Sequence, residues 1–170
     1  SDTERKRLFE SNLLDLKNEL RDLFGMKDRN SKEKLNPYSK VVNDYLFKSL
    51  IPDLTQCSLK GGLTTIVDAT FLRYKERRIM QLLSTKMKST YIIIECKCND
   101  SIAAKRIKER LNSKSDPSDA TVEIREKQKE YLEKLKENEE AYKIVYNEKK
   151  SVDQIVKEIN LRLSKNKKLF

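Results

Sequence analysis

The sequence predicts an α/β protein in which a parallel sheet of about three strands is flanked by helices. Short apolar runs alternate with longer stretches of helical periodicity, which is the pattern of βαβ units. The clearest run, Thr90–Cys96, is apolar on both faces in its middle, as a buried parallel strand is. With only 3 Gly and 3 Pro, the chain has too few turn residues for a sandwich or a barrel.

Apolar residues recur at helical spacing over most of the 170 residues, and capping residues mark several helix ends. Pro52 lies inside the second helix and is expected to kink or split it. No linker or internal repeat divides the chain, so residues 1–170 are predicted to form a single domain. The expected helices are Thr3–Phe24, Ser39 to the pair Gly61-Gly62, Arg73–Lys86, Asp100–Leu111, Ser118–Glu139 and a last one from Ser151, and the expected strands are Leu63–Val67, Thr90–Cys96 and Ile144–Tyr146.

Charge and residue usage narrow the function. The net charge is +10, which favours an anionic partner such as a nucleotide, a nucleic acid or a membrane surface, although lysines spread along helices are also typical of solvated faces. The chain has no histidine, which removes Ser-His and Cys-His catalysis and makes a zinc site with its 3 Cys improbable. No apolar run reaches membrane-spanning length, so the default setting is cytoplasmic.

An acid and several arginines follow the predicted strand Leu63–Val67. Asp68 stands at its carboxyl end, and Arg73 and Arg77 open the next helix. Ligands of open α/β sheets bind at this edge, and such a group suits a phosphate with a metal ion. The alternative is that Asp68 caps the helix and the arginines are solvated.

A second pair of arginines lies on one face of the helix Asp100–Leu111. Arg106 and Arg110 are four residues apart, so both guanidinium groups point the same way and can clamp a polyphosphate. The alternative is ordinary pairing with acids four residues away, for which Lys105 and Glu109 already offer one example.

Taken together, these groups resemble the P-loop kinase-like, AAA-type ATP-binding domain of bacteria, which is often fused to an aminoglycoside-phosphotransferase-like domain. The plan is similar to that of gluconate and polynucleotide kinases. The matching residues keep the family's order and approximate spacing over nearly the whole chain. The resemblance rests on Ser1-Asp2 with Arg5-Lys6-Arg7-Leu8, Tyr38-Ser39, Val67-Asp68-Ala69-Thr70-Phe71-Leu72-Arg73 with Arg77, Cys96, Arg106 with Arg110, Asp116 with Ser118-Asp119-Ala120, and Gln128.

The resemblance implies a role for each matching residue in transfer of a phosphoryl group from ATP with Mg²⁺ to a hydroxyl. Positioning and charge neutralisation are what such a transfer mainly requires. The implied catalytic residues are Asp2, as the base, and Arg106 and Arg110, on a lid over about residues 106–120. The implied substrate-binding residues are Arg5, Arg73 and Arg77. Thr70 and Asp119 would bind the cofactor, and Asp68 would bind the metal ion.

One part of the pattern is missing. The sequence contains no G-x-x-x-x-G-K-[ST] motif, so the phosphate cradle, its lysine and the hydroxyl that ligates Mg²⁺ are absent from it. A carboxy-terminal fragment of a longer kinase, a truncated P-loop NTPase fold, is favoured over a degenerate family member. In either case these residues alone are expected to bind ATP weakly or not at all. The alternative function is a basic α/β module that binds nucleic acid or a partner protein without catalysis.

The missing part also bears on the sheet. In the family that the chain resembles, the strand leading into the phosphate loop lies between the strands that correspond to Leu63–Val67 and Thr90–Cys96. Buried backbone groups are almost always paired, so we expect these two strands to pair directly, or else a strand of a second molecule to fill the gap. The implied site residues Asp2, Asp68, Arg73, Arg106 and Arg110 are expected to converge on one edge of the sheet.

Overall fold

The computed structural model describes residues 2–10, 39–113, 118, 120–147 and 149–166. The chain forms two compact units, unit 1 over Ser1–Thr70 and unit 2 over Phe71–Phe170, and each is described by itself. Whether residues 1–170 act as a single domain, as the sequence predicts, is not tested by this division into units, and it stays a prediction. Among the described residues, no helix is long and apolar enough to cross a bilayer.

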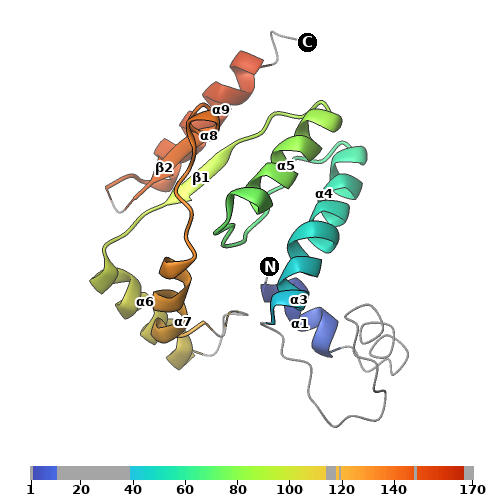
Figure 1. Cartoon of the computed structure of the whole chain (residues 1–170). Helices are drawn as coiled ribbons and strands as arrows, with labels where there is room; N and C mark the ends of the chain where they lie inside the picture. Colours follow the sequence, from blue (N-terminus) through green and yellow to red (C-terminus); the bar gives the residue numbers. More distant parts are fainter. Residues whose placement is uncertain (1, 11–38, 114–117, 119, 148, 167–170) are drawn as a thin grey trace, which may run out of the picture. The chain divides into compact units, whose positions relative to one another are not determined.

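Unit 1 is built from helices (Figure 1). They are α1 (Asp2–Glu10), α3 (Lys40–Tyr45), the π-helical segment η1 (Leu46–Leu50) and α4 (Ile51–Lys60). α1 confirms the start of the predicted helix Thr3–Phe24, whose remainder lies outside the described residues. The second helix begins where the sequence predicts, because the Ser39 hydroxyl accepts a hydrogen bond from the Val42 N–H at 3.3 Å.

Pro52 interrupts this second helix as expected. It stands in the first turn of α4, directly after η1. Proline lacks an N–H and its ring clashes with the carbonyl four residues earlier, so widening the preceding turn to a π-helix accommodates it without ending the helix. The helix ends at the predicted glycine pair, where Gly62 adopts a left-handed φ of 75°.

The segment Leu63–Val67 is not a strand, contrary to the sequence prediction. It is irregular, and two of its apolar side chains are strongly exposed, Leu63 at 62% and Ile66 at 87%. β-branched composition favours a pleated surface only where a neighbouring strand supplies hydrogen bonds and packing. No ladder of the described residues includes this segment, so the expected pairing with Thr90–Cys96 is wrong.

Unit 2 contains the sheet. Its strands β1 (Ile93–Cys96) and β2 (Lys143–Tyr146) run parallel, with Ile93 opposite Lys143 and Cys96 opposite Tyr146. The parallel arrangement confirms the prediction for these two strands, while the third is not found among the described residues. The helix α9 (Val152–Asn166) packs against β2, and the guanidinium of Arg162 donates to the Lys143 carbonyl at 2.7 Å (Figure 1).

The other helices of unit 2 are α5 (Tyr74–Lys86), α6 (Asp100–Ser113), α7 (Val122–Glu130) and α8 (Glu137–Glu140). α5 and α6 confirm two predicted helices. The single helix expected over Ser118–Glu139 is wrong, since α7 begins after Thr121 and ends at Glu130, and extended chain follows. Tertiary hydrogen bonds replace the helical ones there, because the Glu133 N–H donates to the Leu72 carbonyl at 2.8 Å.

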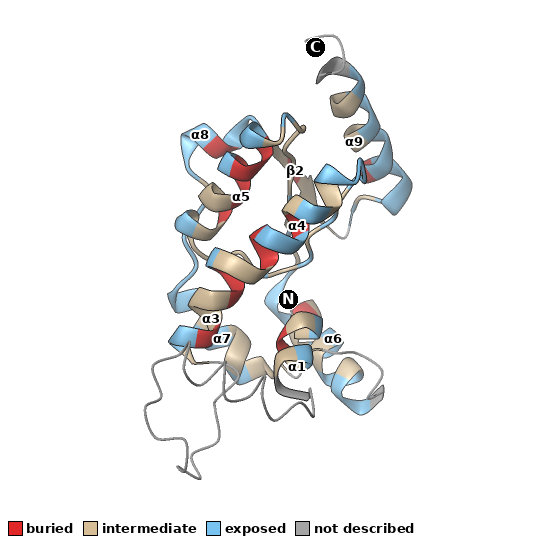
Figure 2. Cartoon of the chain, turned by 90° about the vertical axis from the view of Figure 1, so that its right-hand side faces the viewer, coloured by how far each residue is buried: buried red, intermediate tan, exposed pale blue. Residues whose placement is uncertain are grey.

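Buried apolar side chains occur in both units, and the buried residues are drawn red in Figure 2. In unit 1 they come from one face of α3, η1 and α4, with Val42 and Leu46 fully buried. In unit 2 they come from α5, α6, β2 and α9. The larger set is Val42, Leu46, Phe47 and Ile51 in unit 1, and Met80, Leu83, Ala103, Ile144 and Ile155 in unit 2.

Candidate functional site

A small open hollow lies at the carboxyl ends of the two parallel strands in unit 2. It is lined by Arg106 from α6, by the last residues of β1 and β2, Cys96 and Tyr146, and by the residues that follow them, Lys97, Cys98 and Asn147. The strand pairing continues to this edge, because the Lys97 N–H donates to the Tyr146 carbonyl at 2.8 Å. The carboxyl end of parallel strands is where open α/β sheets bind ligands, so this hollow is the candidate binding site of unit 2.

The two arginines of α6 differ in their surroundings. Arg106 is exposed and lines the hollow. Arg110, one turn later, is half-buried, and its Nη2 donates to the Ala120 carbonyl at 2.9 Å. Arg110 therefore ties the end of α6 to the segment that leads into α7, while the guanidinium of Arg106 is placed to meet a ligand.

A second contact ties α6 to α7 at the opposite end of the pair. The carboxylate of Asp100 accepts from Arg125 and from Lys129, both at 2.8 Å. The hydrogen bond from Lys129, followed by that from Arg125, lowers the pKa of Asp100. Of the lid expected over residues 106–120, α6 includes residues 106–113. The contacts at both ends hold α6 and α7 as one hairpin.

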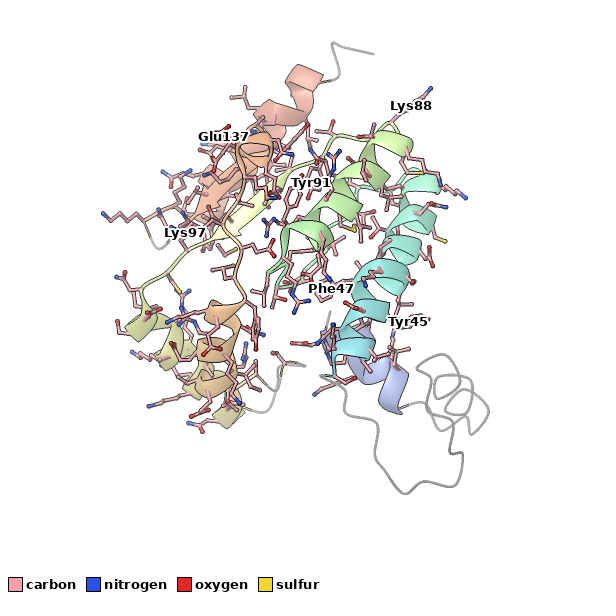
Figure 3. All side chains as sticks on the ribbon, viewed as in Figure 1. Tyr45, Phe47, Lys88, Tyr91, Lys97 and Glu137 are labelled. Atoms are coloured by element: carbon pink, nitrogen blue, oxygen red, sulfur yellow. The ribbon has the colours of Figure 1, made fainter. Side chains whose placement is uncertain are left out.

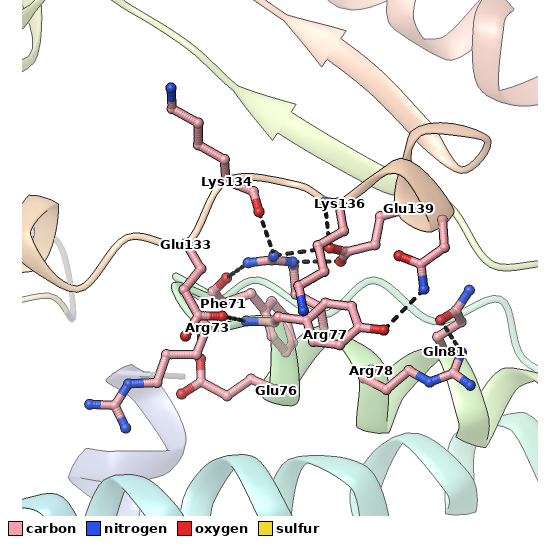
Figure 4. A network of polar contacts seen from close by, with 12 residues as sticks. Phe71, Arg73, Glu76, Arg77, Arg78, Gln81, Glu133, Lys134, Lys136 and Glu139 are labelled. Atoms are coloured by element: carbon pink, nitrogen blue, oxygen red, sulfur yellow. Dashed lines mark hydrogen bonds and ion pairs between the residues drawn. The ribbon is translucent and has the colours of Figure 1, made fainter.

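Arg77 is enclosed by the protein (Figure 4). Its guanidinium binds the Glu139 carboxylate through two hydrogen bonds of 2.7 and 3.0 Å, and it also donates to the carbonyls of Phe71 and Lys134. Arg77 is 5% exposed and Glu139 2%. A guanidinium has five N–H donors, and four of those of Arg77 are used in these hydrogen bonds. This geometry gives Arg77 a structural role. The substrate-binding role that the sequence suggests stays a prediction.

The pair is electrostatically reinforced. Burial alone raises the pKa of Glu139, but the hydrogen bonds from Arg77 and from the Lys136 N–H prevail and lower it. Burial likewise lowers the pKa of Arg77, and the bond to Glu139 outweighs this and raises it. Both groups are therefore charged at neutral pH, as a buried pair must be to offset its desolvation.

The same network holds the turn that begins unit 2. Phe71 has a φ of 41°, a left-handed conformation that costs a bulky residue about 1 kcal/mol or more. Its carbonyl is bound by Arg77 at 3.0 Å, and the next carbonyl, that of Leu72, is bound by the Glu133 N–H. The Glu133 carboxylate also accepts a hydrogen bond from the Tyr74 N–H at 2.7 Å. Glu139 of α8 and the segment that precedes α8 therefore fix the first turn of α5.

Arg73, the other arginine predicted at this turn, is half-buried and stands at the N-cap of α5. Its guanidinium lies 6.0 Å from the centre of the Tyr131 ring. Its own N–H donates to the Glu76 carboxylate at 3.3 Å, and burial raises the pKa of Glu76. The structure thus places Arg73 next to Phe71 but away from the buried pair.

In unit 1 the predicted base and a predicted substrate-binding residue lie together. Asp2 and Arg5 are one turn apart on α1, with 3.8 Å between Oδ1 of Asp2 and Nε of Arg5. Arg5 is buried, and its Nη2 donates to the side-chain oxygen of Asn43 on α3 at 2.8 Å. This contact fixes α1 against α3 and leaves the Asp2 carboxylate half-buried at the start of the helix.

The remaining predicted residues are distributed between the units. Asp68 and Thr70 are exposed in unit 1, on the irregular segment before Phe71. Asp119 lies outside the described residues. Since Arg73, Arg106 and Arg110 belong to unit 2, the expected convergence of all these side chains on one sheet edge stays a prediction.

Several residues that shape these sites were missed by sequence reasoning. Asn43 and Glu139 each hold a predicted arginine, at 38 and 62 residues' distance in the sequence, and no local pattern marks either of them. Tyr146 and Asn147 had a signal, because Tyr146 ends the predicted strand that lies parallel to β1 and Asn147 follows it. The rule that led to Asp68 at a strand end therefore applies to Asn147 as well.

The described residues are compatible with a weakly held Mg²⁺. No group of three or more His, Cys, Asp or Glu among them is arranged to hold a metal ion. Mg²⁺ bound with a nucleotide usually takes only one or two carboxylates, and the phosphates and water supply its other ligands. The exposed carboxylate of Asp68 fits this limited requirement.

Comparison with known protein families gives a match over most of the chain. The model of a family described as AAA domain matches residues 1–135. This range covers most of the chain and includes Asp2, Asp68, Arg106 and Arg110. Neither the curated proteins nor the solved structures contain a match.

Proposed function

Because the chain belongs to the AAA domain family of P-loop NTPase-like, kinase-type nucleotide-binding domains, we propose that it serves an ATP-dependent phosphotransferase acting on a hydroxyl acceptor. The observation that carries the proposal is Arg106 in the hollow at the carboxyl ends of β1 and β2. An exposed guanidinium at this edge suits a nucleotide, because it pairs with phosphate oxygens in a bidentate way and stacks on flat rings.

The proposed work of α6 is to neutralise charge. Arg106 binds the nucleotide directly, and Arg110 reaches it when the α6–α7 hairpin moves, giving up its 2.9 Å bond to the Ala120 carbonyl. Phosphoryl transfer spreads negative charge over the equatorial oxygens, and arginines that meet this charge lower the barrier. Asp119, next in sequence to Ala120, is proposed to contact the cofactor from the same segment.

Unit 1 is proposed to supply the acceptor side. The Asp2 carboxylate accepts the proton of the acceptor hydroxyl, and Arg5, 3.8 Å away, keeps it oriented. Asp68 would hold Mg²⁺, and Thr70 would contact the cofactor. Bound Mg²⁺-ATP supplies the phosphoryl group and neutralises part of its charge, and Arg73 is proposed to bind substrate beside it.

A second candidate function is binding to nucleic acid without catalysis. The net charge of +10 is carried almost entirely by residues 71–170, which form unit 2. Such an asymmetry favours a polyanion on that unit. The two candidates differ in salt dependence, because polyanion binding falls steeply with salt and a small nucleotide in a defined hollow responds less.

Titration of the protein with Mg²⁺-ATP, followed by nuclear magnetic resonance of the backbone amides, tests the proposal. We expect weak binding, with a Kd of about 1 mM, because the sequence lacks the phosphate loop. The shifted signals should cluster at residues 96–98 and 147. Arg106→Gln should abolish these shifts, whereas Lys105→Gln, its exposed neighbour on α6, should leave them. Low-micromolar binding, or shifts that ignore Arg106, would mean that the nucleotide site is elsewhere.

A further inference from the structure

The hollow at the ends of β1 and β2 contains two thiols. Cys96 is exposed and Cys98 is half-buried, and both line the hollow together with Arg106. None of Cys57, Cys96 and Cys98 is in a disulfide. Residues two apart in an extended segment point to the same face, so the two thiols share the side on which Arg106 approaches.

Lys97, between the two cysteines, also lines the hollow, and its ammonium lies 3.2 Å from the Glu95 carboxylate. Figure 3 shows Lys97 on the segment that runs from β1 toward α6. Because the charge of Lys97 is paired with Glu95, Arg106 from α6 supplies the further positive charge beside the thiols, with Arg125 of α7 within electrostatic range of Cys98.

We propose that this hollow is a thiol-exchange site at which Cys96 forms a mixed disulfide with an anionic, low-molecular-weight disulfide of the glutathione type. Thiolates are the reacting species, and site-selective exchange requires an accessible cysteine in an electropositive setting. Cys96 meets the first condition by its exposure, and Arg106 meets the second.

The exchange balances without any further reagent. The Cys96 thiol loses its proton to water, and its sulfur attacks one sulfur of the small disulfide. The Cys96–sulfur bond forms as the reagent's sulfur–sulfur bond breaks, and the other half leaves as a thiolate that takes up a proton. Cys96 is oxidised and the leaving half is reduced, and a second thiol reverses the reaction.

The mixed disulfide is expected to persist. Closing a bond between Cys96 and Cys98 would expel the attached group. The pairing of β1 with β2 continues through Lys97, whose N–H donates to the Tyr146 carbonyl, and residues two apart in extended backbone are separated by about 6.6 Å between Cα atoms. That is at the upper limit for a disulfide. The attached group therefore stays in the hollow and occupies the space proposed for the nucleotide. This regulatory consequence rests on the proposed function, whereas the exchange itself does not.

The test measures the exchange rate at each cysteine by mass spectrometry of the protein, with anionic glutathione disulfide and cationic cystamine compared at low salt. Cys96 should react at least about threefold faster with the anionic reagent, because a unit charge about 6 Å away in water changes a rate by about that factor. Arg106→Gln should remove the preference, and the matched control Lys105→Gln, an exposed residue next to it on α6 outside the hollow, should keep it. Cys57, exposed on α4, should respond equally to both variants and reports any general effect on folding.

Two outcomes overturn the proposal: equal rates with both reagents at Cys96, or equal losses in the two variants. Loss of the adduct in Cys98→Ser but not in Cys96→Ser would also overturn it, by assigning the chemistry to the wrong thiol. Mg²⁺-ATP titration of the modified protein completes the experiment. Absence of binding to the unmodified protein contradicts the proposed function and leaves the exchange result standing.

Discussion

Two arginines of unit 2 show how tertiary partners decide the role of the same side chain. Arg77 on α5 and Arg106 on α6 are both predicted from the sequence to bind phosphate. Arg77 is 5% exposed and is held by Glu139 and two carbonyls, whereas Arg106 is exposed in a hollow at the sheet edge. The difference indicates that Arg77 fixes the backbone around Phe71, while Arg106 stays accessible to solvent at the edge of the sheet.

Breaking the buried pair should have the largest effect. Glu139→Gln leaves the Arg77 charge buried without its counter-charge, and we expect a loss of about 3–5 kcal/mol in the free energy of unfolding, measured with urea. Arg106→Gln, the matched change at the exposed arginine, should alter stability by less than about 0.5 kcal/mol. Similar losses in both variants would remove the distinction between the two arginines.

Replacing both members of the pair should recover part of the loss. In Arg77→Met with Glu139→Leu, no buried charge remains uncompensated, and apolar replacements of similar volume for buried ion pairs are often neutral or stabilising. Recovery will be incomplete, because the carbonyls of Phe71 and Lys134 lose their donor. If the double variant is less stable than Glu139→Gln, the uncompensated charge of Arg77 is not the main cause of the loss in the single variant.

The buried pair also predicts a dependence of stability on pH. The pKa of Glu139 lies below its ordinary value of 4.5, because hydrogen bonds from Arg77 and the Lys136 N–H outweigh the effect of burial. A depressed folded-state pKa adds stability above the unfolded-state value, and this stability is lost as the pH falls through the folded-state pKa. Unfolding free energies should therefore decline from pH 5 toward pH 2 more steeply in the parent than in Glu139→Gln. Parallel curves would contradict the assignment.

Backbone strain at the end of α5 gives a smaller prediction. Lys88 is exposed and follows the helix with a φ of 50°, a position at which glycine is favoured (Figure 3). Lys88→Gly should raise the free energy of unfolding by up to about 1 kcal/mol. Lys86→Gly, inside the last turn of α5, should lower it by a similar amount. Thermal melts of the two variants should therefore shift in opposite directions.

Breaking the contacts of Asp100 between α6 and α7 should have the smallest effect on the free energy of unfolding. Asp100 is fully exposed, so its bonds to Arg125 and Lys129 are screened by solvent. Asp100→Asn should increase amide exchange in α7, and added salt should have the same effect in the parent. Exchange that is unchanged in Asp100→Asn would show that other contacts hold the hairpin.

Sequence reasoning located local features well. The cap at Ser39, the interruption before Pro52, the glycine pair after α4 and the two parallel strands all follow from residue types and short-range periodicity. It failed at Leu63–Val67, where a β-prone run lacks a neighbouring strand among the described residues. It failed again after Glu130, where bonds to residues about 60 positions earlier replace a helix that the composition favours.

The residues of the candidate site likewise fall into those that sequence rules locate and those that only tertiary contacts explain. The spacing of Arg106 and Arg110 on one helix led to Arg106, whereas the rule that strand ends carry ligands led to Asp68, Arg73 and Arg77. The opposite role of Arg77 depends on Glu139, which is 62 residues away and carries no local signature. Spacing on one helix can state which arginines lie side by side, but only the partners from other elements determine which of them remains accessible.

The most direct measurement observes the arginine side chains themselves. The Nε–H resonances of Arg77 and Arg106 can be assigned from Arg→Lys variants and followed during titration with Mg²⁺-ATP at moderate salt. The Arg106 signal should shift and sharpen on binding, while the Arg77 signal, held at 2.7 Å from Glu139, should stay in place and exchange slowly. A shift of the Arg77 signal with an unchanged Arg106 signal would contradict the assignment of the two arginines and of the nucleotide site.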